Sequence, residues 1–179
     1  MDLSQIKLYV EIHEAHKKYT KADFLSKVYM DEARYDVLAA QLKHKKNIIL
    51  QGAPGVGKTF AAKKLAYSIM GEVDDSRIEL VQFHQNYSYE DFVMGYRPND
   101  KGGFELTEGI FYRFCQKAAN KPEQDHFFII DEINRGNLSK IFGELLMLVE
   151  KDYLRGSDYE QRVRDLRVFP SCSIGSLHG

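Results

Sequence analysis

Short apolar runs that alternate with amphipathic helical patterns predict an α/β fold for this chain. The first observation is an apolar run, 48–52, that ends in a glycine-rich loop and precedes a helical pattern from about Lys58 to Gly71. The second is 78–83, which alternates and is rich in β-forming residues. The third is 127–130, four large apolar residues typical of a fully buried strand. Together they predict a sheet whose strands are separated by helices.

The loop after the first strand carries the spacing G-x-x-x-x-G-K-T, closed by Gly57, Lys58 and Thr59. Its glycines let backbone N–H groups wrap a triphosphate, and the following helix aims the positive end of its dipole at the phosphates. We expect Lys58 to neutralise the β and γ phosphates and Thr59 to bind Mg²⁺. An ordinary glycine-rich turn is the alternative, but the flanking strand and helix favour a Walker A phosphate loop. The residues expected to contact the nucleotide are Gly52, Ala53, Pro54, Gly55, Val56, Gly57, Lys58, Thr59 and Phe60.

Two acidic residues, Asp131 and Glu132, directly follow the third strand. Behind a complete phosphate loop they are expected to be the Walker B acids: Asp131 holds the magnesium, usually through water, and Glu132 polarises the water that attacks the γ-phosphate. A helix cap is the alternative interpretation of such a pair. Asn134 and Arg135 follow closely enough to touch the nucleotide or a neighbouring subunit, as sensing or intersubunit residues.

The segment before the phosphate loop is predicted to be helical. Residues 1–18 form a first helix, the capping box of Thr20 and Asp23 opens a second, and Asp31 starts a third that ends in the basic run 43–46. That run has the charge to contact nucleic acid or phosphate. Positive charge at a helix C-terminus is also what the helix dipole favours, and this is the simpler explanation.

A polar and aromatic segment, 84–92, follows the second strand at the end where ligands bind in open α/β sheets. The same segment can be a loop with a capping box between Ser88 and Asp91, and both interpretations can hold together. Beyond it we expect a turn-rich excursion over 97–103 and a helix over 110–118.

After the acidic pair the chain begins as a helix and then loses its periodicity. An apolar helix is expected over 141–149, with Asn137 or Ser139 as its cap. The segment 160–167 has the charge pattern of a short helix, and 169–179 contains no strand of convincing length.

Composition and charge argue against several classes of protein. The net charge is −1, so there is no global basic field for nucleic acid, and any DNA contact would be local. Cys115 and Cys172 lie far apart, with no CxxC and no histidine pair at ligand spacing, which indicates neither a disulfide framework nor a zinc site. No apolar run has the length of a membrane span, and the start is not a signal peptide, so we expect a cytoplasmic protein with no membrane partner.

Five runs of the sequence resemble the NTPase module of the McrB family, AAA+ motors of modification-dependent restriction systems within the dynein-related AAA group. The resemblance spans roughly 46–152, and its middle runs are more specific than the phosphate loop, which many families share. The runs are 47–60, 81–92, 95–98, 109–112 and 131–140.

This resemblance implies an AAA+ P-loop NTPase: a parallel sheet with helices on both faces that assembles with copies of itself into a ring. It also implies a McrC-like endonuclease partner that cleaves modified DNA, so that DNA is an indirect partner. GTP is the implied substrate, although wider relatives use ATP, and Mg²⁺ is the implied cofactor. On the matching motifs, Lys58 carries over as a phosphate ligand, Thr59 and Asp131 as metal ligands, and Glu132 as the residue that activates water.

The resemblance stops after the helix that ends near Glu150. The family continues with a further strand and a Met-Asn-Thr-Ala-Asp-Arg run, which supply a polar sensor and a basic group, and this chain matches neither. The region before Thr20 is also too short for a modified-base recognition domain. We therefore expect a partial module: an N-terminal helical segment over 1–45, an incomplete AAA+ core over 46–152, and a divergent or poorly ordered tail over 153–179.

The unmatched strand would lie in the sheet between the strands that end at Gln51 and Asp131. The best internal substitute is 167–174, a weak one because Pro170 lacks an N–H donor. Backbone groups buried without partners cost about 1 to 3 kcal/mol each. We therefore expect weak nucleotide binding, marginal stability and turnover near background.

Three functions compete at this point. The first is nucleoside triphosphate binding and Mg²⁺-dependent hydrolysis in a restriction motor, and the second is a truncated remnant that binds nucleotide or oligomerises without hydrolysis. The third, a small-molecule kinase, is disfavoured because Glu132 directly after Asp131 suits activation of water rather than of a substrate hydroxyl. Nucleotide binding and turnover, measured together, separate the first two.

Overall fold

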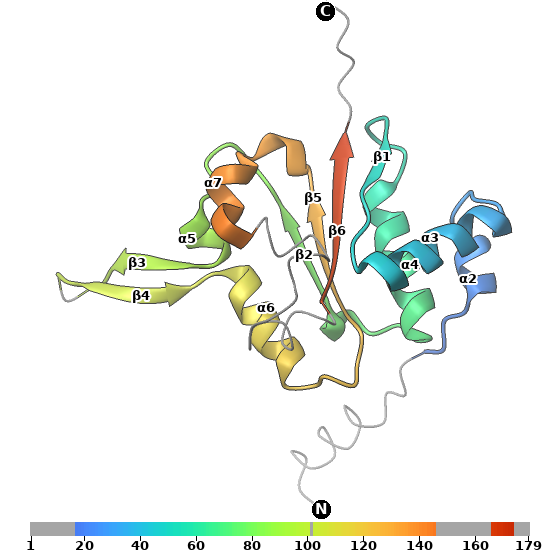
Figure 1. Ribbon diagram of the computed structural model, residues 1–179, viewed down its shortest axis with the longest axis horizontal. Helices are drawn as coiled ribbons and strands as arrows, with labels where there is room; N and C mark the ends of the chain where they lie inside the picture. Colours follow the sequence, from blue (N-terminus) through green and yellow to red (C-terminus); the bar gives the residue numbers. More distant parts are fainter. Residues whose placement is uncertain (1–16, 101, 146–165, 174–179) are drawn as a thin grey trace, which may run out of the picture.

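The computed structural model describes residues 17–100, 102–145 and 166–173 (Figure 1). The helix expected over 1–18 lies outside this part except at its end, where Lys18 forms an isolated bridge with Glu72 and is not helical. The described helices are α2 (Lys21–Leu25), α3 (Glu32–Lys45), α4 (Lys58–Met70), α5 (Tyr89–Phe92), α6 (Ile110–Ala119) and α7 (Leu138–Phe142), with 3₁₀ turns η1 (Asp75–Arg77), η2 (Ile133–Arg135) and η3 (Gly143–Leu145). The described strands are β1 (Leu50–Gly52), β2 (Ile78–Gln82), β3 (Met94–Pro98), β4 (Phe104–Glu108), β5 (His126–Asp131) and β6 (Leu166–Ser173).

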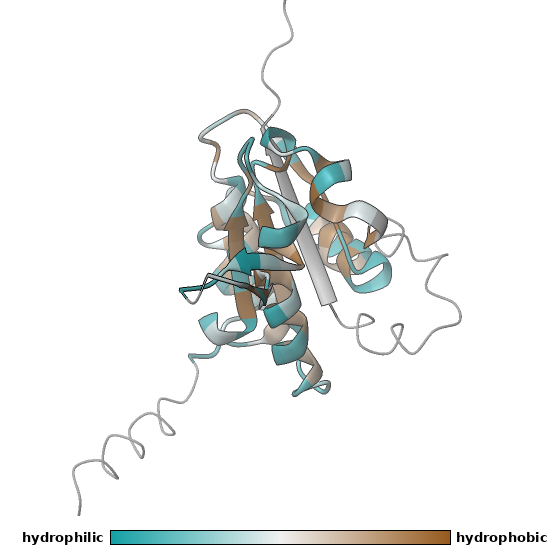
Figure 2. Cartoon of the chain, turned by 90° about the vertical axis from the view of Figure 1, so that its left-hand side faces the viewer, coloured by the Kyte–Doolittle hydropathy of each residue, from teal (hydrophilic) through white to brown (hydrophobic). Residues whose placement is uncertain are grey.

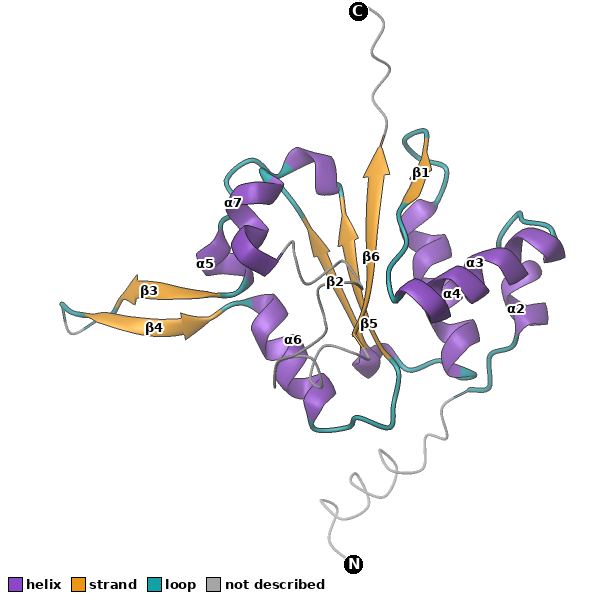
Figure 3. Cartoon of the chain, in the orientation of Figure 1, coloured by secondary structure: helices purple, strands orange, loops and turns teal. Residues whose placement is uncertain are grey.

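The main sheet is parallel, with the strand order β1-β6-β5-β2, and helices flank it (Figure 3). Strand β2 pairs with β5 along its whole length, from Ile78 opposite Phe127 to Gln82 opposite Asp131. Strands β1 and β5 are not neighbours, because β6 lies between them. The α/β fold with a parallel sheet is therefore confirmed.

Strand β6 corrects the expectation that the chain after 169 contains no convincing strand. It occupies the position between β1 and β5 for which 167–174 was the best internal candidate, judged a weak one, and Leu166–Arg167 are extended rather than helical. Its residues up to Pro170 pair with β5, and those from Ser171 onward pair with β1. Proline's missing N–H therefore falls where β6 changes partners, which is a less demanding place than the middle of a continuous ladder.

Strand β5 contributes to two hydrophobic cores, one on each face of the sheet. Phe127 and Ile129 pack with α2, α3 and α4, whereas Phe128 and Ile130 pack with α5, α6 and α7. Successive side chains of a strand point to opposite faces, so burial on both faces requires an uninterrupted apolar run. Figure 2 shows the apolar colour concentrated on the central strands, with polar residues on the outer helices.

Side-chain caps start the helices where the sequence predicts them. Thr20 and Asp23 form a complete capping box before α2, and Ser88 and Asp91 form another before α5. The carboxylate of Asp31 accepts a backbone N–H from the first turn of α3. Caps of this kind stabilise a helix by about 1 kcal/mol each, because they satisfy N–H groups that the helix leaves unpaired.

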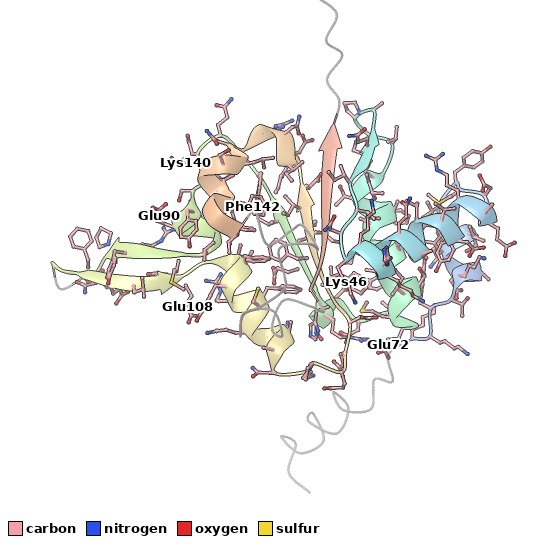
Figure 4. All side chains as sticks on the ribbon, in the orientation of Figure 1. Lys46, Glu72, Glu90, Glu108, Lys140 and Phe142 are labelled. Carbon is pink, nitrogen blue, oxygen red and sulfur yellow. The ribbon has the colours of Figure 1, made fainter. Side chains whose placement is uncertain are left out.

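The basic run 43–46 forms the end of α3 and finishes at Lys46, labelled in Figure 4. Lys46 adopts a left-handed conformation with φ 63°, and its backbone N–H donates to the carbonyl of Leu42 at 2.9 Å. The positive charges therefore lie where the helix dipole favours them, as the simpler interpretation expects.

Asn137 is the N-cap of helix α7: its side chain accepts the backbone N–H of Lys140 at 3.1 Å, while Ser139 lies inside the helix. Its last residue, Phe142, which is labelled in Figure 4, packs on the ring of Phe83 in the core. Gly143, with φ 52°, follows as the C-cap. The apolar helix expected over 141–149 is therefore broken at this glycine, and most of that range lies outside the described residues.

A two-stranded hairpin, β3 and β4, projects from the body of the molecule (Figure 1). The sequence predicts only its turn, over 97–103, and the structure adds the antiparallel strands on either side. Tyr96 lies opposite Leu106, and both side chains are exposed, as is that of Phe104. Alternating apolar residues form these strands without burial, so the usual burial pattern of a strand is absent.

Candidate nucleotide-binding site

The phosphate loop connects β1 directly to α4, as predicted. Gly55 and Gly57 have φ values of 78° and 79°, a left-handed conformation that a residue with a side chain adopts only at a cost. Gly57 is the N-cap of α4 and makes no side-chain hydrogen bond there. The N–H groups of the first helical turn therefore point out of the helix without a side-chain cap, which is the arrangement that binds an anion.

The amine of Lys58 lies over the loop that contains it. Its Nζ donates hydrogen bonds to the carbonyl oxygen of Gly52 at 3.1 Å and to that of Ala53 at 2.9 Å. A methyl group added at Gly52 would approach Val56 to 3.3 Å, so the loop is closely packed around this lysine. The amine thus occupies the concave side of the loop, where it would meet phosphate oxygens.

The two acids lie at the carboxyl end of β5, at the same edge of the sheet as the phosphate loop. The backbone carbonyl of Asp131 accepts the N–H of Phe83 at 3.0 Å, which fixes the end of β5 against the chain leaving β2. The carboxylate of Asp131 accepts the backbone N–H of Glu132 at 3.0 Å. Glu132 itself turns into a left-handed conformation, with φ 52° and ψ 41°. The chain therefore changes direction sharply at the acid that is expected to activate water.

In the sheet, one strand, β6, separates the phosphate loop after β1 from the acids after β5. Gly52 pairs with Ser173 of β6, and Ile130, which precedes Asp131, pairs with Pro170 of the same strand. Two inter-strand spacings separate β1 from β5, roughly 9 to 10 Å. That separation leaves room for phosphate groups and a hydrated cation between the loop and the acids.

The donor set fits magnesium. Thr59 offers a hydroxyl and Asp131 a carboxylate, the hard oxygen ligands that Mg²⁺ takes one or two at a time while it keeps water and phosphate oxygens. Within the described ranges, no cluster of three or more His, Cys, Asp or Glu residues could form an all-protein metal cage. Thr59 also lines a cavity of about 120 Å³ between α4 and strands β2 and β5, but neither Asp131 nor Glu132 lines it, so this cavity is not the proposed magnesium position.

Arg135 contacts the acid expected to activate water. Its Nε donates to Oε2 of Glu132 at 3.1 Å across the turn η2, and Asn134 lies exposed on the same turn. The side chain of Arg135 is 62% exposed and that of Glu132 only 18%. The structure thus brings Arg135 to Glu132 and assigns no role to Asn134.

The polar segment 84–92 begins at the carboxyl end of β2, beside the acids, as predicted from its position. The ring of His84 contacts the ring of Tyr87 edge-on, and Tyr87 stacks on Phe83. Burial raises the pKa of the Tyr87 hydroxyl above its usual range. The segment is therefore held by aromatic packing, and its capping box is present as well.

Sequence reasoning missed Lys64, which packs among aromatic rings on α4. Its Nζ lies 5.0 Å from the ring centre of Tyr67, 5.2 Å from that of Phe60 and 5.8 Å from that of Tyr19. Burial, with the charges of neighbouring lysines, lowers the pKa of the Lys64 amine. The i, i+4 spacing of Phe60 and Lys64 on a predicted helix was the signal available. The contact places the Lys64 amine beside Phe60, the last of the residues expected to contact the nucleotide.

The chain is similar to an AAA domain family and to two restriction-enzyme components. Residues 47–170 match the AAA domain (dynein-related subfamily). The chain is 54% identical over 136 residues to the EcoKMcrB subunit of the type IV methyl-directed restriction enzyme of Escherichia coli (strain K12), covering 76% of this chain and 29% of that protein. It is 26% identical over 139 residues to YdiS, a component of the type II restriction enzyme BsuMI of Bacillus subtilis (strain 168), covering 64% and 40%.

A solved structure from Cytophaga hutchinsonii shares a TM-score of 0.48 and 18% sequence identity, over 88% of this chain and 43% of that one. The chain thus spans less than half the length of each of these three proteins. No helix among the residues that the structure describes has the length and apolar character to cross a bilayer.

Proposed function

The chain belongs to the dynein-related subfamily of AAA domains, and from this premise we propose that it binds a nucleoside triphosphate with Mg²⁺ and hydrolyses it. One observation carries the proposal: the phosphate loop and the acids Asp131 and Glu132 lie at the same edge of the sheet, one strand apart. A phosphate loop alone would support binding only. The acids at this distance add a metal ligand and a base.

Each residue has a distinct task in this proposal. The first-turn N–H groups of α4 and the Lys58 amine bind and orient the phosphates, and the amine exchanges its two carbonyl partners for phosphate oxygens. Thr59 and Asp131 hold Mg²⁺, which would supply charge neutralisation at the phosphates. Glu132 accepts a proton from the attacking water. The alternative, binding without hydrolysis, requires that Glu132 fail in this last task.

We further propose that the chain is the motor portion of a McrB-like restriction system. The identity to the E. coli subunit supports this role, although the chain spans only 29% of that protein. The partners would be copies of itself in a ring and a McrC-like endonuclease, with modified DNA contacted indirectly. We also propose a cytoplasmic location, with which the free thiol of Cys115 is compatible. The three-part division of the chain, with boundaries at 45 and 152, stays part of this proposal.

Binding and turnover of GTP and ATP, measured side by side with Mg²⁺ on the purified chain, test the proposal and select the base. Glu132→Gln should keep nucleotide affinity and lose turnover, because an amide keeps the shape of the side chain and cannot act as a base. Arg34→Ala, an exposed change on α3, is the control and should behave as wild type. Binding without turnover in the wild type would support the remnant, and absence of binding in a folded chain would refute both.

A further inference from the structure

Glu132 has a backbone conformation that its surroundings must maintain. Of the residues described, only Lys46 and Glu132 combine a side chain with positive φ, and Lys46 ends a helix, where this conformation is common. At Glu132 the left-handed conformation is unfavourable, because it brings the Cβ atom close to the following carbonyl oxygen. Strain of this kind at a reactive group persists where contacts hold the group in one direction.

Contacts from its own turn hold Glu132. Its N–H donates to the Asp131 carboxylate at 3.0 Å, and its carbonyl accepts the N–H of Arg135 at 2.9 Å. Beyond these backbone bonds, the side chains of Glu132 and Arg135 meet through Oε2 and Nε at 3.1 Å. A carboxylate bound through one oxygen has a restricted rotation, so the direction of its other oxygen is restricted as well.

The ion pair is better suited to orient Glu132 than to stabilise the fold. A solvent-exposed ion pair contributes little to stability because water screens it, and the Arg135 side chain is 62% exposed. Glu132, by contrast, is mostly buried at the edge of the sheet, beside the proposed metal ligand. The arginine therefore reaches inward from the surface to an acid that sits in the site.

We propose that Arg135 is a positioning residue for Glu132 of the same subunit. It directs the carboxylate toward the attacking water, and its guanidinium does not contact the nucleotide of its own or of a neighbouring subunit. This inference rests on the proposed hydrolysis. It replaces the sensing or intersubunit role that the sequence suggests for Arg135.

Two substitutions separate positioning from nucleotide contact. Arg135→Met should lower kcat about 10- to 100-fold, since a small displacement of a reacting group has effects of this size. Nucleotide affinity should stay within about twofold, because in this proposal the guanidinium acts on Glu132 and not on the nucleotide. Arg135→Lys should restore part of kcat, because an ammonium group at i+3 can also reach the carboxylate. A loss of affinity that matches the loss of kcat would overturn the inference.

Mixing variants separates action within a subunit from action between subunits. In an assembly of Arg135→Met with Glu132→Gln chains, each subunit lacks one member of the pair, so turnover should stay at the level of the variants alone. An arginine that acted on a neighbour would restore turnover at mixed contacts, and such recovery would overturn the inference. Wild type mixed with Glu132→Gln is the control for mixing and should retain turnover.

The outcomes for the two proposals are distinguishable. Wild-type chain without turnover would refute the proposed hydrolysis, and the inference would fall with it. Wild-type turnover combined with recovery in the mixture, or with loss of affinity in Arg135→Met, would refute the inference alone. If the wild type hydrolyses nucleotide as a monomer, a kcat loss in Arg135→Met at unchanged affinity already establishes action within one subunit.

Discussion

Strand β6 joins the two halves of the proposed site, so we expect the fold to depend on it. The perturbation is a chain that stops at Asp165, which removes β6, and the matched control is a chain that stops at Ser173, which keeps it. The control should melt at the same temperature as the full chain. The shorter chain should show no cooperative unfolding transition.

The magnitude follows from the register. Strand β6 forms five residue pairs with β5 and three with β1, and all of them are lost in the shorter chain. With about one backbone hydrogen bond for each residue pair, and about 1 kcal/mol of net stability for each bond, the loss is about 8 kcal/mol. The total stability of a domain is about 5 to 15 kcal/mol. Removal of β6 therefore eliminates most or all of the free energy of unfolding.

Circular dichroism during heating measures the transition, and amide hydrogen exchange shows whether β1 and β5 remain protected. One kcal/mol shifts the melting temperature of a chain of this size by about 2 to 4 °C. A chain ending at Asp165 that melts cooperatively within about 3 °C of the control would refute the reasoning. It would show that β1 and β5 find partners without β6.

Three further predictions concern single residues. Lys58→Ala should leave the melting temperature of the nucleotide-free chain nearly unchanged. It should abolish the rise in melting temperature that Mg-nucleotide causes in the wild type, where ligand at one hundred times Kd adds about 2.7 kcal/mol of stability. A retained rise in scanning fluorimetry would contradict the role of Lys58. Gly109→Ala should lower the urea midpoint of unfolding strongly, because a Cβ atom there would collide with the backbone of Phe92. Gly103→Ala is the control and should not lower it, because its Cβ atom would meet the nearest atom at 3.5 Å. Equal midpoints for the two variants would contradict this packing. Burial lowers the pKa of His126 below 6.5, so the unfolded chain binds more protons than the folded chain, and stability should fall as the pH drops below about 6.5. Urea unfolding from pH 5 to 7.5 should show this decrease in the free energy of unfolding. The decrease should be absent in His126→Phe.

Local signals were sufficient for the phosphate loop and the helix starts. The loop residues from Gly52 to Thr59 are contiguous, and their spacing alone requires a strand before them and a helix after them. Capping boxes span four residues, so the pairs Thr20–Asp23 and Ser88–Asp91 could be recognised without knowledge of the fold. The pair Asp131 and Glu132 could be recognised as site residues because a buried strand ends at Asp131.

Features that depend on partners far away in the sequence could not be recognised from the sequence alone. Strand β6 contains Pro170, which argues against a central strand unless the change of partner at Ser171 is known. The hairpin strands carry exposed Tyr96 and Phe104, so their alternation does not correspond to burial. The contact between Glu132 and Arg135 was foreseeable from its i, i+3 spacing, but only if the segment was known to be a 3₁₀ turn.

The order of the strands links the assembly of the site to the folding of distant segments. The phosphate loop follows β1 and the acids follow β5, yet these strands touch only through β6, which lies far along the chain from both. Leu50 pairs with Ser171, a contact of high sequence separation that is costly to form before the intervening chain has folded. The distance between the loop and the acids is therefore undefined until β6 inserts. Substitutions that weaken β6 should reduce the population of competent sites without altering a single residue that contacts nucleotide.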